Sequence, residues 1–337
     1  MTMTFILPHA VRGDYHMESV KLVHKFRSRR YKEYAAGYLF ASPAIIGFLV
    51  LTLYPMLASL YYSFNNVELS GKMEWVGFEN FLYLFRDSGS EFGKSITVTL
   101  VYTAVNVILV IGWCLAISLL LNREYTGRNF LRLVFYLPSV IPMLATSILW
   151  KIILQNQAQG GLLNQLLMAL GLETKEWLMD SRLIFVSLFM MSLWTCGGTI
   201  VVFLATLQDV PEELLESVAI EGGNAWHKFR AVVFPTIEPV LFFQALMCMI
   251  TSVQIFTQSV ALSSNGSPDR MTYFINVMIY DHAFKRAGTR GLAAAEAWLV
   301  FIAILAVTGL LFLAQSRIQS RVGPESNHNP RHRRKSI

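Results

Sequence analysis

Long stretches without a charged side chain constrain the fold of this sequence more than any other feature. Residues 34–64 and 96–121 both exceed the roughly 20 residues that an α-helix needs to cross a bilayer. The first is too long for the core of a signal peptide, so we expect it to remain in the chain. Four further apolar stretches follow, at 133–154, 183–208, 240–264 and 297–315. The sequence therefore predicts an all-α, polytopic membrane protein with six transmembrane helices.

The composition agrees with a membrane protein. Of the 337 residues, 54% are hydrophobic and 15% are charged, whereas about a quarter of a soluble domain is charged. The net charge of +6 does not indicate a nucleic-acid partner, because the basic residues cluster beside apolar stretches, as topology signals do in a chain surrounded by lipid. The three cysteines lie inside apolar stretches without CxxC spacing, so we expect neither a disulfide nor a metal site: Cys114, Cys196 and Cys248.

The basic residues also predict the orientation in the membrane. With six spans, both termini lie on the same side as the loops 122–132 and 208–239. Eighteen Lys and Arg residues lie on that side, against seven in the loops on the other side. Because cytoplasmic loops carry the excess of Lys and Arg, we expect both termini in the cytoplasm. The chain then divides into a basic N-terminal segment (1–33), a six-span domain (34–315) and a basic tail (316–337) that we expect to be disordered.

A polar island, residues 209–239, separates the fourth and fifth apolar stretches. Asp209, with Pro211 and Glu212 after it, is typical of a helix start, so we expect a helix from Asp209. Its leucines lie on one face and its glutamates on the other, and Ile220 is the one large apolar side chain on the acidic face.

A bend is expected in the middle of the island. The Gly222-Gly223 pair permits a sharp turn, and a second amphipathic helix follows it. Pro235 and Pro239 are expected to close the unit. On these residues alone the island is either a surface loop with two interfacial helices or a docking element for a partner.

The order of residues in the island resembles the EAA signature of ABC-importer permeases, which reads roughly E-A-A-x-x-D-G-A and continues with F, I and two prolines. Ser217-Val218 stand in place of the two alanines, Glu221 in place of Asp and Gly223 in place of the last Ala. In that family the loop forms a coupling helix that docks in a cleft on a cytoplasmic ATPase. The resemblance assigns ATPase coupling to Glu216, Ser217, Val218, Ile220, Glu221, Gly222, Gly223, Phe229 and Pro235.

Weaker similarities to sugar-type permeases of this family extend over most of residues 35–315. They are the stretches WVGFENF at 75–81, FYLP at 135–138, GGLLN at 160–164 and WL at 177–178. The resemblance implies a non-catalytic subunit of a carbohydrate importer in the bacterial inner membrane. It also implies a solute-binding protein outside the cell, a second permease subunit, which is usually a different chain but can be a copy, and two ATP-binding subunits that hold ATP and Mg.

Gly93-Lys94-Ser95 looks like the end of a P-loop, but Ser88 stands where the first glycine belongs and no strand is expected before it. We therefore expect the nucleotide on another chain, and no cofactor or catalytic residue on this one. The functional alternatives are an ABC permease for another solute, such as a glycerol phosphoester or a small peptide, and an unrelated six-span channel or membrane enzyme. The spans lack the charged rings or acid–base pairs that the last two need.

Substrate contacts are predicted from residue type. Sugars bind to hydrogen-bonding side chains and flat aromatic faces. Gln254, Thr257 and Gln258 form the best set, because their i, i+3, i+4 spacing places them on one face of the fifth span. Lys151 either extends to the lipid surface or meets an anionic substrate such as an oligouronide. For each candidate a helix–helix hydrogen bond or interfacial anchoring is the alternative: Asn106, Lys151, Gln155, Asn156, Trp194, Thr195, Gln254, Thr257 and Gln258.

Overall fold

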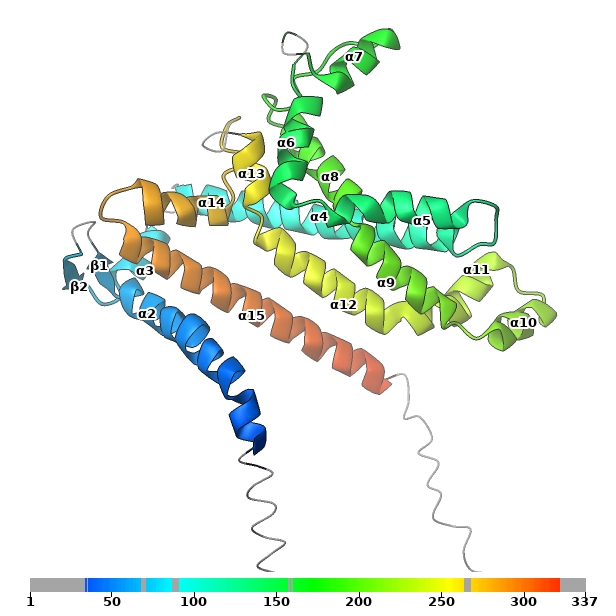
Figure 1. Ribbon diagram of the computed structural model, residues 1–337, viewed down its shortest axis with the longest axis horizontal. Coiled ribbons are helices and arrows are strands. Elements are labelled where there is room, and N and C mark those ends of the chain that lie inside the picture. Colours follow the sequence, from blue (N-terminus) through cyan, green and yellow to red (C-terminus); the bar gives the residue numbers. More distant parts are fainter. Residues whose placement is uncertain are drawn as a thin grey trace, which may run out of the picture. The chain divides into compact units, whose positions relative to one another are not determined.

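The computed structural model describes residues 34, 36–67, 71–86, 91–156, 158, 160–263 and 268–321, and their regular structure is almost entirely helical (Figure 1). The chain divides into two compact units, one ending at Tyr61 and the other beginning at Tyr62. Four helices in the described part are long and apolar enough to cross a membrane, and two bent helix pairs raise that number to six. The predicted all-α membrane fold is confirmed, with two of its six spans bent. Segments 1–33 and 322–337, including most of the predicted tail, lie outside the described residues.

Two of the prolines inside the spans, Pro55 and Pro235, follow a π-helical turn. The first span, Ala36–Ser63, contains the π-helix η1 (Leu49–Leu53) followed by α2 (Tyr54–Ser63). The N–H of Tyr54 bonds to the carbonyl of Leu49, five residues back, directly before Pro55. In an α-helix the proline ring would meet the carbonyl four residues back. The wider π turn changes the bonding pattern at that position, so the helix continues through Pro55.

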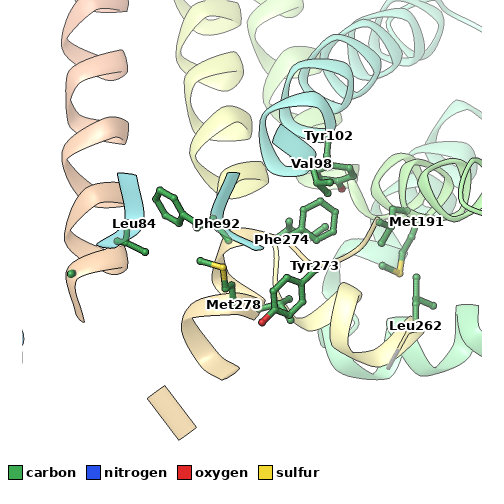
Figure 2. Packing of buried hydrophobic residues seen from close by; sticks show 14 residues of the cluster. Leu84, Phe92, Val98, Tyr102, Met191, Leu262, Tyr273, Phe274 and Met278 are labelled. Carbon is green, nitrogen blue, oxygen red and sulfur yellow. The ribbon is translucent and has the colours of Figure 1, made fainter. Parts of the chain in front are cut away.

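The second unit is built around α4 (Glu91–Leu121), which packs against α12 (Phe234–Val253), α8 (Leu183–Thr195) and α9 (Gly197–Gln208). One buried cluster lies at the N-terminal end of α4, where the ring of Tyr102 meets the edge of Phe274 with centroids 5.1 Å apart (Figure 2). Tyr102 also stacks on Phe189, with centroids 5.3 Å apart. A second cluster surrounds Cys114 and Phe203 further along α4. These contacts position the remaining helices of the unit.

The third span is broken, which corrects the prediction of one helix over 133–154. It consists of α5 (Arg128–Tyr136), the 3-10 turn η2 (Leu137–Val140) and α6 (Met143–Ile153), with a bend of 103°. Ile141 is extended because Pro142 follows it and disfavours helical angles. The fourth span bends by 48° between α8 and α9. Gly197 lies at this bend, where a Cβ would collide with the backbone of Phe135 on α5.

The fifth span also differs from the predicted range 240–264. One continuous helix of 29 residues runs from Ala225 to Val253 and comprises α11 (Ala225–Lys228), the π-helix η4 (Phe229–Val233) and α12. Pro235 and Pro239 therefore lie inside a helix and do not end it, because η4 precedes Pro235 as η1 precedes Pro55. After a break come α13 (Thr257–Leu262), α14 (Ile275–Tyr280), the π-helix η5 (Asp281–Lys285) and α15 (Arg290–Arg321).

Short elements connect the spans. The predicted polar loop 65–93 contains an antiparallel hairpin, β1 (Asn65–Val67) and β2 (Met73–Trp75), and the helix α3 (Glu79–Arg86). Asn65 pairs with Trp75 in the hairpin, and the amide of Asn80 donates to the carbonyls of Ser63 and Asn65. Gly93, Lys94 and Ser95 lie in the first turns of α4, and the connection after α6 contains α7 (Leu162–Ala169).

Candidate functional site

The helix of the polar island, α10, runs from Glu212 to Ile220. We call residues 212–230, which contain α10, the following turn and the start of the long helix, the elbow (Figure 1). The predicted N-cap was wrong: Asp209 has helical backbone angles and its N–H bonds to the carbonyl of Thr206, so it ends α9. Pro211, with extended angles, stands before the first turn of α10 instead.

The bend predicted at Gly222 is confirmed, and the bonds of the turn explain it. The N–H of Gly223 donates to the carbonyl of Val218 at 2.9 Å, and the N–H of Gly222 donates to Ala219 at 3.0 Å. This pair of bonds is a Schellman motif, which closes a helix through a residue in the left-handed region. Gly222 occupies that position with φ of +80°, where any side chain is strained.

Gly223 is required for a different reason. A Cβ at this residue would lie 2.5 Å from Cγ1 of Val218 and 3.3 Å from Cβ of His227. The chain passes too close to α10 at this point for any side chain. Beyond it, Asn224 caps the next helix: its Oδ1 accepts from the backbone N–H of His227 at 3.0 Å, and the His227 side chain closes the capping box. The elbow is therefore held on both sides of its turn.

The elbow presents an uncovered surface of acidic and apolar side chains. No residue of α10 is buried, and Ile220 is 88% exposed beside the exposed carboxylates of Glu216 and Glu221. Trp226 is 64% exposed and stacks on Phe229, with ring centroids 5.6 Å apart. A cavity of about 520 Å³ opens inside the turn, lined by Val218, Glu221, Gly222, Gly223, His227, Arg230 and Ala231. Ser217 and Pro235 are also exposed, whereas Phe229 is half-buried.

Among the predicted substrate residues, the set on the fifth span does not share a face. Gln254 ends α12, and Phe256, with φ of −145° and ψ of −62°, interrupts the helix before Thr257 and Gln258 on α13. The i, i+3, i+4 argument therefore fails at these residues. Gln254 is exposed and the other two are half-buried.

Asn106 is buried, at 5% exposure. Its Nδ2 donates to the hydroxyl of Ser252 at 2.9 Å, which joins α4 to α12. This geometry is the helix–helix hydrogen bond that was the alternative role for this residue.

Helix α6 brings several of the other candidates together, because it packs against both α13 and α8. Trp194 on α8 meets Trp150 on α6 edge to face, with centroids 6.0 Å apart, and Lys151 is exposed on the next position of α6. Thr195 donates to Met191 within its own helix. Gln155 and Asn156, both half-buried, follow the end of α6.

Sequence reasoning missed two residues of α6. The hydroxyl of Thr146 and the Nε1–H of Trp150, one helical turn apart, are buried and have no hydrogen-bond partner among the described residues. Buried donors without a partner are rare in native proteins, and a hydroxyl or water of a ligand can satisfy them. The sequence does contain a signal for this pair. Thr146 and Trp150 are spaced i, i+4 on one helix, which places a flat aromatic face and two polar groups side by side.

The segment after α6 is fixed by Asn164, which is fully buried. Its Nδ2 donates to the carbonyls of Gln155 and Lys175, and its Oδ1 accepts from the N–H of Lys175 and from Nε1 of Trp177. Gly161 packs directly on the backbone of Gln155, where a Cβ would not fit. We call residues 155–182 the α7 arm. At its end the Asp180 carboxylate accepts from the N–H groups of Arg182 and Leu183, and these bonds hold the pKa of Asp180 below its usual value.

Comparison with known proteins identifies the family of this chain. The family model described as "binding-protein-dependent transport system inner membrane component" matches residues 108–323, which include the whole elbow. The chain belongs to this family. The probable ABC transporter permease protein YesP of Bacillus subtilis is 34% identical over 87% of this permease and 94% of its own length.

Further relatives and solved structures agree with the membership. The probable starch degradation products transport system permease protein AmyD of Thermoanaerobacterium thermosulfurigenes is 28% identical over 83% of the permease and 94% of its own length. A crystallised bacterial ABC transporter involved in the import of the acidic polysaccharide alginate shares the fold, with a TM-score of 0.75 and 22% identity over 86% of the permease and 99% of that chain. Membership in the family removes the unrelated channel and the membrane enzyme as alternatives.

Proposed function

We propose that this chain is the transmembrane permease subunit of an ATP-driven importer that moves a sugar or oligosaccharide from a solute-binding protein into the cytoplasm of a bacterium. Similar curated permeases are described as transporting starch degradation products, arabinooligosaccharides, and trehalose or maltose. A permease for a glycerol phosphoester or another solute is the alternative, and a direct uptake assay separates the two.

The elbow carries the proposal that ATP hydrolysis is coupled through this chain. Its turn is closed by a Schellman motif and a capping box, so the direction of α10 is well defined. No side chain of the described residues covers its outer surface of Glu216, Ile220 and Trp226. A rigid, exposed acidic and apolar surface is suited to a partner with a basic group beside an apolar pocket, and we assign that partner to the ATPase.

The complete transporter would contain a second permease subunit, two ATP-binding subunits that hold ATP and Mg, and the solute-binding protein. The distribution of Lys and Arg supports an inner-membrane orientation with both termini and the elbow in the cytoplasm. A related structure contains an alginate importer in complex with a pentasaccharide-bound periplasmic protein. The α7 arm and the segment before α15 would then face that protein, on the side of the membrane opposite the elbow.

The substrate contacts are proposed on α6, α8 and α13. Trp150 and Trp194 supply aromatic faces. The Thr146 hydroxyl and the Trp150 N–H, which have no partner in the described part of the chain, supply hydrogen-bonding groups. An acidic saccharide such as an oligouronide is a second candidate, favoured by the exposed Lys151 next to Trp150.

Reconstitution tests the proposed function. The purified chain alone should hydrolyse no ATP, and hydrolysis together with uptake of a labelled oligosaccharide should appear only after a P-loop-bearing subunit, a second permease and a solute-binding protein are added. Nucleotide turnover by the pure chain would contradict the assignment of ATP to another subunit. Uptake of a phosphoester but of no saccharide would contradict the substrate class.

A further inference from the structure

The WVGFENF stretch at residues 75–81 has no role in the proposed transport function, and it folds into a compact aromatic corner at the end of the first span. The ring of Phe64, directly after α2, stacks on Trp75 with centroids 5.7 Å apart and meets the edge of Phe78 at 5.3 Å. The N–H of Val76 donates to the carbonyl of Phe64 at 3.0 Å. The corner is therefore folded back onto the residue that follows the first span.

Asn80 and Gly291 attach this corner to two spans. The side-chain amide of Asn80 donates to the carbonyl of Ser63, the last residue of α2, at 2.9 Å and to that of Asn65 at 3.1 Å. Gly291, in the first turn of α15, packs on the same place, because a Cβ there would collide with the carbonyl oxygen of Asn65 and lie 3.1 Å from Nδ2 of Asn80. Helix α3 follows the corner and packs on α15 as well. Its position is therefore fixed at the ends of the first and sixth spans.

Helix α3 has a buried face and an exposed apolar stripe beside it. An α-helix turns by about 100° per residue, so Phe78, Leu82 and Phe85 lie within about 60° of one another around its axis. Phe78 belongs to the first turn, because its carbonyl accepts from the N–H of Leu82 at 3.0 Å. These three side chains, which we call the α3 stripe, are 68%, 49% and 65% exposed. Leu84, on the buried face, belongs to the cluster at the N-terminal end of α4 (Figure 2).

The α3 stripe is continuous with the apolar surface of the spans. Phe85 lines a groove of about 690 Å³ between α4, α12 and α15, which is also lined by Leu299 and Leu311 on α15. At 1.5 Å per residue these two leucines lie about 18 Å apart along the helix, which is more than half of the roughly 30 Å of hydrocarbon in a bilayer. Of the described residues that line the groove, only Thr99 and Thr103 are polar. The stripe therefore extends an apolar surface that runs along membrane-spanning helices.

We propose that α3 is an interfacial anchor whose stripe inserts into the lipid at the boundary of headgroups and acyl chains. The connection that contains α3 runs from the end of the first span at Ser63 to the start of the second at Glu91, so both of its ends lie at the membrane surface. Aromatic side chains concentrate at that level of a bilayer, and amphipathic helices lie there with their apolar face in the lipid. Tyr83 is also exposed but lies about 100° or more around the helix from each residue of the stripe, so it faces water.

Site-directed spin labelling tests the anchor without a transport assay. The full-length permease, with its three cysteines changed to Ala, is labelled at Leu82→Cys or Phe85→Cys and placed in vesicles of phosphatidylethanolamine and phosphatidylglycerol. Both labels should collide more with oxygen, which concentrates in hydrocarbon, than with a water-soluble nickel chelate, and should lie about 5–10 Å into the headgroup and acyl boundary. Tyr83→Cys is the matched control, and its label should collide more with the nickel chelate. Labels at Leu82 and Phe85 that favour the nickel chelate, or that behave as the Tyr83 label does, would overturn the proposal.

Photo-cross-linking in intact cells identifies what covers the α3 stripe in the complete assembly. A benzophenone amino acid replaces Phe85, or Tyr83 as the control, in a chain that keeps its three cysteines. We expect phospholipid adducts at Phe85, several-fold more than at Tyr83, because only the first of these positions lies in the lipid. A cross-link from the Phe85 position to another polypeptide, such as a second permease or a solute-binding protein, would show that a protein covers the stripe and would overturn the anchor.

Discussion

The Cβ that Gly223 lacks would lie 2.5 Å from Cγ1 of Val218, on the opposite side of the elbow turn. In the family signature both positions are alanines. This chain has a larger side chain at the first position and none at the second, so the two departures compensate each other. The backbone carbonyl of Val218, 2.7 Å from the same Cβ, opposes a side chain at residue 223 as well, so the contact has a side-chain part and a backbone part.

Gly223→Ala should therefore destabilise the permease by about 1–3 kcal/mol, as overpacking of a tight contact does. In a Val218→Ala background the cost should fall by about 1 kcal/mol, because Cγ1 of Val218 is then removed, while the carbonyl of Val218 and Cβ of His227 still lie close to the new methyl group. Denaturation of the four chains in detergent measures this coupling. Gly309→Ala, at a helical glycine with open space around it, is the control and should cost little. Additive effects of the two substitutions would contradict the compensation.

Substitutions in the elbow should affect coupling to the ATPase subunit and have little effect on folding. Glu216→Lys reverses an exposed charge, and loss of a buried interfacial charge pair typically costs about 2–5 kcal/mol of binding. Gly222→Val forces a side chain into the left-handed region, which costs roughly 1–2 kcal/mol and re-aims α10. Both should abolish uptake while membrane abundance and the second permease are retained. Normal uptake by Glu216→Lys would remove the coupling role from this surface.

Asn164 should stabilise the α7 arm far more than the adjacent Gln165 does. Asn164→Ala leaves the N–H and carbonyl of Lys175, the carbonyl of Gln155 and Nε1 of Trp177 without this partner, and buried orphans cost about 1–3 kcal/mol each. We expect a loss of at least about 2 kcal/mol in unfolding free energy. Gln165→Ala removes one exposed bond to Gly160 and is the matched control. Equal losses from the two substitutions would show that the bonds of Asn164 do not hold the arm.

Lys151→Gln should change the uptake of neutral oligosaccharides little, because the ammonium is exposed on α6 and its stem can extend toward the lipid surface. Parallel uptake assays with a neutral oligosaccharide and an oligouronide measure its role. A selective loss of about tenfold or more for the oligouronide, equal to 1.4 kcal/mol or more, would identify an anionic substrate. An equal loss for both sugars, or none, would remove the acidic saccharide as a candidate.

The parts of the fold that the sequence predicted correctly are those that one residue type determines locally. Gly222 was expected at a bend because only glycine adopts positive φ without strain, and it is found there. The spans were found from their lack of charge. The predicted start of the fifth span was wrong because prolines ordinarily end helices. The sequence of residues 229–233 shows no pattern that predicts the π turn through which the helix continues.

The substrate candidates show where periodicity fails. Residues 253–257 contain neither proline nor glycine, so the spacing of Gln254, Thr257 and Gln258 predicted one face, yet the backbone breaks at Phe256. The break follows from tertiary packing of α13 on α6, which a local pattern does not contain. The pairing of His282 with Glu296 is likewise invisible in the sequence, since α14, η5 and α15 must fold back before the two side chains meet.

The π turn at Phe229–Val233 determines how the elbow is rotated about the axis of α12. Each residue of an α-helix advances the chain by about 100° around the axis, so the one residue that a π turn adds rotates everything before it by that amount relative to α12. Removing a single residue there would leave the composition of the elbow intact and aim it at a different neighbour. The angular position of α10 about the axis of the fifth span is thus determined by the number of residues in this turn, independently of which side chains the elbow carries.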